Sequence, residues 1–309
     1  MSRTPSPGPR RAGPWGARRS TWPSAHGSAE GRRRPGWTTP RGATAPAPCS
    51  TSAAVRGAAC PRVACRAAPN GGSHPFVEAG YTVCYVSRRR GMPRGHTVED
   101  VADDVSGFVR EQLGGRADLV VGVSYGGMVA QLLAARHGRL LGRVALVASA
   151  ARVNDWGRDV DARLAAAVER GDRSLAGATF GEYVLPAARW RWLRRLAGPL
   201  LGRMLMSGRD HPASDVVVEA ESEVAFDARP VLPGIRVPVL VLCGDEDQFF
   251  AADVVAETVR LVPGARFVGY PGRGHLWVAS SRQVPRDILR WLAEQPGPAA
   301  TEAAEGDLS

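Results

Sequence analysis

The sequence contains no lysine and only two isoleucines, Ile235 and Ile288, among its 309 residues. All 40 basic residues are therefore arginines, a bias that we attribute to GC-rich codon usage and from which we infer no function. The chain also lacks any apolar run of the roughly 18 residues needed to cross a bilayer. Its first residues, MSRTPSPGPRRAGPWG, lack the apolar segment of a secretory signal. We therefore expect a cytoplasmic protein without a membrane span.

Cysteine is sparse and irregularly placed. The five cysteines, at positions 49, 60, 65, 84 and 243, include no C-x-x-C pair and have no neighbouring histidine cluster. An odd, unevenly spaced set is typical neither of a disulfide framework nor of a zinc site. We predict no metal.

The net positive charge of the chain comes from its N-terminal region. Residues 1–66 hold twelve arginines, ten prolines and a single acidic residue, Glu30, and so carry a charge of +11, whereas the whole chain carries +10. The remainder is nearly neutral, so we expect no nucleic-acid partner. The composition predicts a disordered tail. A transit peptide, a polyanion-binding arm and a membrane-surface anchor remain open for it, but we favour an extension without a selected role.

From about residue 76 onward, apolar runs alternate with helical patterns, as in successive βα units. A capping-box spacing at Thr97 and Asp100 opens one helix, over 97–115. Three more helices are predicted over 125–137, 251–262 and 284–295, and strands over 81–87, 118–124, 143–150, 237–247 and 265–272. This order predicts an α/β protein with a doubly wound, mostly parallel sheet.

Residues 151–236 are too many for an ordinary connection and read as helical, so we predict a helical lid inserted into a core of residues 67–150 and 237–295, with a disordered tail at 296–309. Gly198 and Pro199 are expected to divide one lid segment into two helices. That segment has arginines at 189, 191, 194 and 195, and apolar residues near helical spacing at Trp190, Leu193, Leu196, Leu200, Met204 and Leu205. A lipid-touching lid is one interpretation, but we favour an apolar stripe packed inward with arginines in water.

The stretch GVSYGG, residues 122–127, lies where a predicted strand becomes a predicted helix. A serine on such a sharp turn needs small neighbours two positions before and after it, and Gly122 and Gly126 fill these positions around Ser124. The pattern predicts a serine nucleophile.

A base and an acid follow at the carboxyl ends of later strands. Asp247 ends the strand in LVLCGDED, and His275 follows the last strand in GYPGRGHLW. Asp245 and Asp155 are the competing acids, and the G-x-x-D register favours Asp247.

With the chain order Ser124, Asp247, His275, these motifs resemble the serine-nucleophile branch of the α/β-hydrolase family over about residues 74–295. The resemblance implies that Ser124 is the nucleophile, His275 the general base and then acid, and Asp247 the group that orients the imidazole. It also implies an oxyanion-hole donor at the backbone N–H of Tyr125, a small-molecule acyl substrate, and neither metal nor organic cofactor.

Two features depart from the family. The strand expected immediately before 81–87, which lies centrally in the family, would fall in the arginine- and proline-rich region, so the N-terminal strands look missing or replaced. Only RVACRAAPNGG (62–72) could stand in, with Gly71 and Gly72 in the loop that gives the second oxyanion donor. The segment SRRRGMPRG (87–95) replaces the family's usual acid and R-G. One interpretation is that its arginines shape the mouth of the pocket, but we favour a solvated loop.

We therefore expect a serine hydrolase that cleaves a carboxylic ester or related acyl substrate through an acyl-enzyme. Esterases, lipases, thioesterases, C–C hydrolases, acyltransferases and perhydrolases share such a triad, and the sequence does not separate them. The alternative is a catalytically impaired relative that acts as a ligand-binding module or is a truncated remnant.

Overall fold

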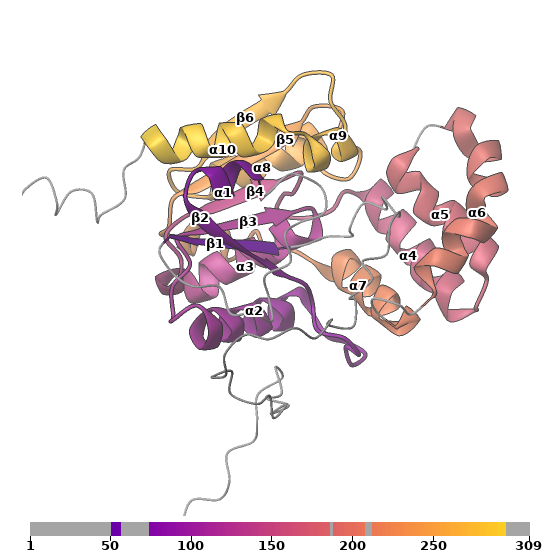
Figure 1. Ribbon diagram of the computed structural model, residues 1–309. Helices are drawn as coiled ribbons and strands as arrows, with labels where there is room; N and C mark the ends of the chain where they lie inside the picture. Colours follow the sequence, from indigo (N-terminus) through magenta and orange to yellow (C-terminus); the bar gives the residue numbers. More distant parts are fainter. Residues whose placement is uncertain (1–50, 57–73, 186–187, 208–211, 295–309) are drawn as a thin grey trace, which may run out of the picture. The chain divides into compact units, whose positions relative to one another are not determined.

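The computed structural model describes residues 51–56, 74–185, 188–207 and 212–294. Its centre is a six-stranded sheet in the order β2-β1-β3-β4-β5-β6 (Figure 1). The strands are β1 Thr51–Arg56, β2 Tyr81–Val86, β3 Leu119–Val123, β4 Val144–Val147, β5 Val239–Gly244 and β6 Arg266–Tyr270. Helices cover both of its faces, so the predicted α/β class is confirmed.

The parallel part of the sheet comprises β3 to β6. Every residue of β4 and β5 is buried, as expected for strands covered on both faces. Because these strands are parallel, their carboxyl ends meet at one edge of the sheet, where residues 124, 148 and 245 follow directly. This edge therefore gathers the loops that carry the predicted motifs.

The strand β1 lies within residues 1–66, which we had assigned to a disordered tail. It fills the place between β2 and β3 and is antiparallel to both, with Thr51 opposite Val86 and Gly122. Both neighbours present free backbone edges there, so backbone pairing can recruit a short segment with weak strand propensity. The alternative segment, 62–72, lies outside the described residues.

The helices of the core flank the sheet in two layers. Figure 1 shows α1 (His74–Glu78) and α10 (Gln283–Glu294) on one face, and α2 (Val98–Gln112) and α3 (Tyr125–His137) on the other. Thr97 and Asp100 form the predicted capping box of α2. The remaining core helices are α8 (Ala252–Leu261), α9 (His275–Ser280) and the short 3-10 turns η1 (Gly138–Leu140) and η3 (Leu232–Gly234).

The described part of residues 151–236, called the insertion below, contains four α-helices. They are grouped beside the sheet in Figure 1. They are α4 Asp155–Glu169, α5 Arg173–Val184, α6 Arg191–Leu205 and α7 Ala213–Ala225, with the 3-10 turn η2 at Ala188–Trp190. Leu164, Val168 and Val217 belong to a hydrophobic cluster of the insertion itself. Within the described ranges, no helix is both long and apolar enough to span a membrane.

The predicted break at Gly198-Pro199 is wrong, because α6 continues through Pro199. Proline removes one backbone donor and frees the carbonyl of the residue four positions earlier, here Arg195. Both residues lie on the exposed side of the helix, where water can satisfy that carbonyl. The helix therefore continues without a buried, unpaired group.

Candidate active site

Ser124 lies on the turn between β3 and α3. Its backbone has φ 55° and ψ −119°, a conformation with positive φ that non-glycine residues rarely adopt. Such a residue costs about 1–3 kcal/mol and persists where the surrounding structure holds it. Here the Ser124 N–H donates to the carbonyl of Val147 on β4, at 2.9 Å, which fixes the turn to the sheet.

Neighbouring atoms leave no room for a Cβ at Gly122 or Gly127. A Cβ on Gly122 would lie 2.3 Å from the carbonyl oxygen of Gly126, in the first turn of α3. Gly126 is itself buried there. A Cβ on Gly127 would lie 2.3 Å from the Cβ of Ser149, a constraint that sequence analysis missed although GVSYGG contains this glycine. These contacts let α3 start directly above β3.

His275, the first residue of α9, links Ser124 to Asp247. Its Nε2 lies 3.0 Å from the Ser124 Oγ, and its Nδ1 lies 2.8 Å from Oδ2 of Asp247. A carboxylate only accepts hydrogen bonds, so Nδ1 carries the proton and Nε2 of the neutral ring accepts from the serine hydroxyl. The structure thus brings the three predicted side chains, 151 and 28 residues apart in sequence, into one hydrogen-bonded chain.

Backbone amides and a thiol hold the Asp247 side chain, which is fully buried. Its Oδ1 accepts from the N–H groups of Phe249 and Phe250, at 2.9 and 3.1 Å. The Sγ of Cys243 lies 3.7 Å from Oδ2. Burial, followed by the charge of Asp247, raises the pKa of the Cys243 thiol, so the thiol stays protonated and donates. The position of Cys243 inside β5 gives no signal of this contact in the sequence.

The turn with the acid and the loop with the histidine are bound to each other. Gly244 explains the glycine of G-x-x-D, because a Cβ there would lie 1.9 Å from the carbonyl oxygen of Arg273. Asp245 accepts from the N–H of Gly272 at 2.7 Å and so stabilises the loop instead of contacting His275. The other competing acid, Asp155, is exposed at the start of α4.

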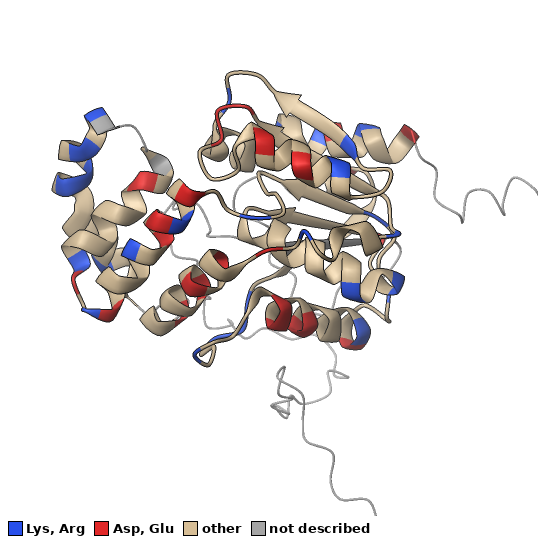
Figure 2. Cartoon of the chain, turned by 180° about the vertical axis from the view of Figure 1, so that it is seen from behind, with Lys and Arg blue, Asp and Glu red and all other residues tan. Residues whose placement is uncertain are grey.

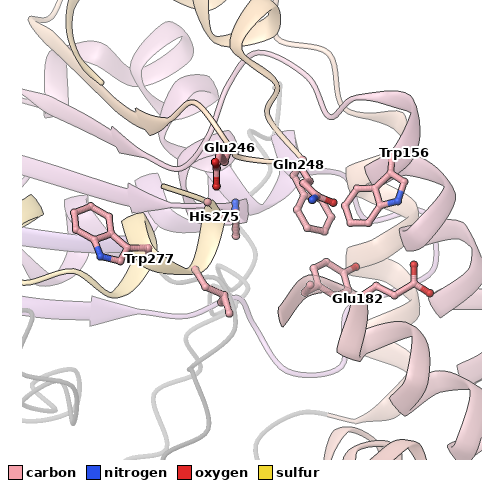
Figure 3. A pocket seen from close by; sticks show the side chains of 10 residues that line it. Trp156, Glu182, Glu246, Gln248, His275 and Trp277 are labelled. Carbon is pink, nitrogen blue, oxygen red and sulfur yellow. The ribbon is translucent and has the colours of Figure 1, made fainter. Parts of the chain in front are cut away.

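A solvent-open cleft with a cavity volume of about 130 Å³ adjoins His275 (Figure 3). Its walls come from both parts of the protein, with Trp277 and Glu246 on the core and Trp156 and Glu182 on the insertion. Phe249 connects the two walls, with its ring 5.3 Å from the His275 ring and 4.8 Å from that of Tyr183. The insertion therefore shapes the space beside the histidine.

Residues 53–278 match the family model of the alpha/beta hydrolase fold. The chain belongs to the α/β-hydrolase family. The matched range begins inside β1 and includes Ser124, Asp247 and His275. No curated protein matches the sequence.

Several solved structures share this α/β-hydrolase fold. The enol-lactonase from Burkholderia xenovorans LB400 is 25% identical, with a TM-score of 0.56 over 72% of this chain and 86% of that one. A thermophilic esterase from Thermogutta terrifontis is 23% identical, with a TM-score of 0.56 over 72% and 84%. A putative non-heme bromoperoxidase, BpoC, from Mycobacterium tuberculosis H37Rv is 19% identical, with a TM-score of 0.57 over 73% and 88%.

In this α/β hydrolase, Tyr125 contacts Ser222 of the insertion and lies within the electrostatic reach of acids on the same helix, Glu219 and Glu223. The Tyr125 hydroxyl lies 3.2 Å from Oγ of Ser222 on α7. Burial and the nearby charge of Glu219 raise the pKa of Tyr125, so the phenol stays protonated. Burial raises the pKa of Asp161 to about 7, although the hydroxyl of Tyr183 donates to it. Burial also raises the pKa of Glu223 well above its usual value.

The segment 87–95 is exposed at six of its nine residues, as expected of a solvated loop, but Arg88 and Met92 are buried. Arg88 is buried and forms an ion pair with Glu219 of α7, with 2.5 Å between Nη2 and Oε2. The N–H groups of Gly91 and Met92 donate to the two carboxylate oxygens of buried Asp215 at 3.0 and 2.9 Å. Acidic side chains of α7 are thus the partners of Arg88 and of the two backbone N–H groups. These contacts, called the clamp below, tie the segment after β2 to the insertion.

The remaining predicted site residues concern the oxyanion hole. Tyr125 begins α3, and the first N–H groups of a helix have no partner within the helix. Gly71 and Gly72 lie outside the described residues. The chain leaves β1 at Arg56, opposite Tyr81 at the start of β2, so it leaves the sheet at the edge away from Ser124. Within the described ranges, no group of three or more His, Cys, Asp or Glu is placed to hold a metal.

Proposed function

We propose that this protein is a serine hydrolase that cleaves a carboxylic ester or a related acyl substrate. The observation that carries the proposal is the hydrogen-bonded chain from Ser124 through His275 to Asp247. The distance of each hydrogen bond falls within the range of about 2.6–3.2 Å that is expected between a nucleophile and its base. The enol-lactonase and the esterase among the similar folds act on acyl compounds by their names, which supports the same substrate class here.

In the proposed reaction, the Ser124 Oγ attacks the acyl carbonyl carbon while its proton moves to Nε2 of His275. The imidazolium, stabilised by Asp247, then gives this proton to the departing alkoxide, and an acyl-enzyme remains. Water attacks the acyl carbon next while His275 takes one of its protons. His275 then gives this proton to the departing Ser124 Oγ, and the carboxylic acid is released. No metal or organic cofactor has a step in this sequence.

The Tyr125 N–H is proposed to bind the oxyanion, because it belongs to the first turn of α3 beside Ser124. The leaving group is proposed to occupy the cleft beside His275, since the proton it needs comes from that ring. Aromatic side chains of Trp156, Phe249 and Trp277 line the cleft, so an apolar or aromatic leaving group suits it best.

The test is labelling of the purified protein with a fluorophosphonate probe, followed by peptide mass spectrometry. We expect one adduct, on Ser124, that disappears in Ser124→Ala. Ser149, buried close to the elbow, gives a matched control, because Ser149→Ala should still be labelled. An unlabelled protein that melts cooperatively would contradict the proposal and would indicate a ligand-binding relative.

The companion measurement is hydrolysis of p-nitrophenyl esters of increasing acyl length. We expect turnover that Ser124→Ala abolishes and Ser149→Ala retains. Labelling of Ser124 without turnover of a p-nitrophenyl ester of any acyl length would refute the esterase activity but would still show that the serine is reactive.

A further inference from the structure

Helix α6 of the insertion presents an exposed row of large apolar side chains. Trp192, Leu196, Leu200 and Met204 are spaced four residues apart, so they lie along one face of the helix. Their exposed fractions are 62%, 73%, 65% and 47%. Our expectation that the stripe packs inward is therefore wrong for Leu196, Leu200 and Met204. Contiguous exposed apolar surface of this kind marks interaction sites.

The inner face of α6 is already filled by other contacts. Gly198 and Gly202 lie against the backbone of α5, where a Cβ on either would come within 2.5 Å of a carbonyl oxygen. Leu205 packs against the hydrophobic cluster of the insertion. Since these residues fix α6 to α5, the exposed row has no part in holding the insertion together.

A row of arginines runs beside the apolar row. Arg191, Arg195 and Arg203 are exposed and each directly precedes a member of the apolar row. The helix contains no acidic residue, and within the described part of the chain no acidic side chain pairs with these three arginines. Figure 2 shows the basic colour repeated along α6. A helix that is apolar on one side and basic beside it is typical of segments that lie in a lipid interface.

We propose that α6 docks the protein onto an anionic phospholipid surface. The row of Trp192, Leu196, Leu200 and Met204 enters the boundary of headgroups and acyl chains, and the arginines contact the phosphates. A second copy of this chain fits the same face less well. Two α6 helices that buried their apolar rows together would also bring two basic rows close to each other. The docking does not depend on the proposed hydrolase activity.

The test is flotation of the full chain with vesicles of phosphatidylcholine alone or enriched in phosphatidylglycerol. We expect binding only to the anionic vesicles. Leu196→Gln with Leu200→Gln removes apolar surface without changing charge and should lower the partition coefficient about ten-fold or more. The matched control is Val77→Gln on α1, since Val77 is also exposed, at 55%, and this variant should bind like the wild type.

A second pair of variants separates local contact from general charge. Arg191→Gln with Arg195→Gln should lower the partition coefficient about five-fold for each arginine lost. Arg282→Gln with Arg286→Gln removes the same charge from exposed positions near α10 and should have a much smaller effect. Equal losses from both pairs would overturn the proposal, because charge alone would then explain binding.

Two further results would also overturn it. Unchanged vesicle binding by Leu196→Gln with Leu200→Gln would show that the apolar row does not insert. A wild-type dimer that this variant converts to monomer in sedimentation velocity, without vesicle binding by either, would assign the face to a second copy. Fluorophosphonate labelling of Ser124 in the same variant reports on the site separately, so failure of docking and failure of the hydrolase proposal are distinguishable.

Discussion

Replacing Gly122 by alanine tests the physical reasoning about the elbow directly. The added Cβ would lie 2.3 Å from the Gly126 carbonyl oxygen and 2.7 Å from the Gly127 Cα. These distances are about 1 Å shorter than the ~3.5 Å at which such atoms pack favourably. All the neighbours are backbone atoms, so no side chain can rotate away. The start of α3 must therefore move relative to β3.

The expected magnitude follows from this displacement. Overpacking in a close-packed interior costs about 1–3 kcal/mol, which for a domain of this size lowers Tm by roughly 3–10 °C. The effect on rate should be larger than the effect on stability. Ser124 would shift with the turn, and a displacement of about 1 Å at a reacting group can cost about 100-fold in rate. Thermal melting and p-nitrophenyl ester hydrolysis measure the two effects separately.

Gly138→Ala is the matched control at the other end of the same helix. Gly138 has φ −52° and ψ −30°, which alanine adopts easily, and its added Cβ would meet only Val237 Cγ1 at 3.6 Å. We expect unchanged activity and a stability gain of about 0.4–1 kcal/mol. If Gly122→Ala melted and turned over like the wild type while Gly138→Ala behaved as expected, the close-approach argument for the elbow would be refuted.

Three further predictions concern charged side chains. Asp247→Asn should lower kcat/KM by about 10⁴-fold, because the imidazole loses the correct tautomer, whereas Asp245→Asn should keep kcat/KM within a few-fold of the wild-type value. Equal losses in the two variants would show that Asp247 does not have the orienting role. Arg88→Met leaves Glu219 buried without its partner and should lower the free energy of unfolding by about 3–5 kcal/mol, and adding Glu219→Leu should recover most of it; a loss unchanged in the double variant would argue against the ion pair. The raised pKa of Asp161, about 7, means that the folded state keeps a proton the unfolded chain releases above about pH 4. The stability that this group contributes is therefore fully present below about pH 4 and is lost as the pH rises to about 7. The free energy of unfolding, measured by urea denaturation, should depend less on pH in Asp161→Asn than in the wild type. The same pH dependence in both proteins would refute the raised pKa of Asp161.

The sheet and the edge that carries Ser124, Asp247 and His275 were predictable because each local signal agreed with the fold. The strands β3, β4 and β5 are short apolar runs, and the capping box of α2 marks a helix start. The glycines at 122 and 244 are needed where backbones approach closely, and they belong to the G-x-S-x-G and G-x-x-D motifs from which the site was predicted. Sequence reasoning could thus place Ser124, His275 and Asp247 at strand ends, although not the distances between them.

The clamp was not predictable, because it depends on tertiary partners. Arg88 lies in a run of three arginines that resembles a solvated loop, and its buried partner Glu219 follows 131 positions later. The exposed row of α6 escaped prediction for a related reason. An amphipathic pattern gives the apolar side of a helix but not whether that side faces protein or solvent. Here glycines at 198 and 202, not leucines, make the contact with α5.

The direction of β1 could not be predicted from the sequence either. It affects one part of the proposed chemistry, the second oxyanion donor, but not the other, the hydrogen-bonded chain of Ser124, His275 and Asp247. The triad residues follow β3, β5 and β6, whose parallel order does not involve β1. The second oxyanion donor, by contrast, is expected from the chain after β1, which leaves the sheet at Arg56, on the edge away from Ser124. Fluorophosphonate labelling depends mainly on the serine and histidine, whereas ester turnover also needs the oxyanion stabilised, at about 10²–10³-fold in rate per donor. The ratio of the turnover rate to the labelling rate therefore measures how completely the region around β1 supports the proposed oxyanion stabilisation.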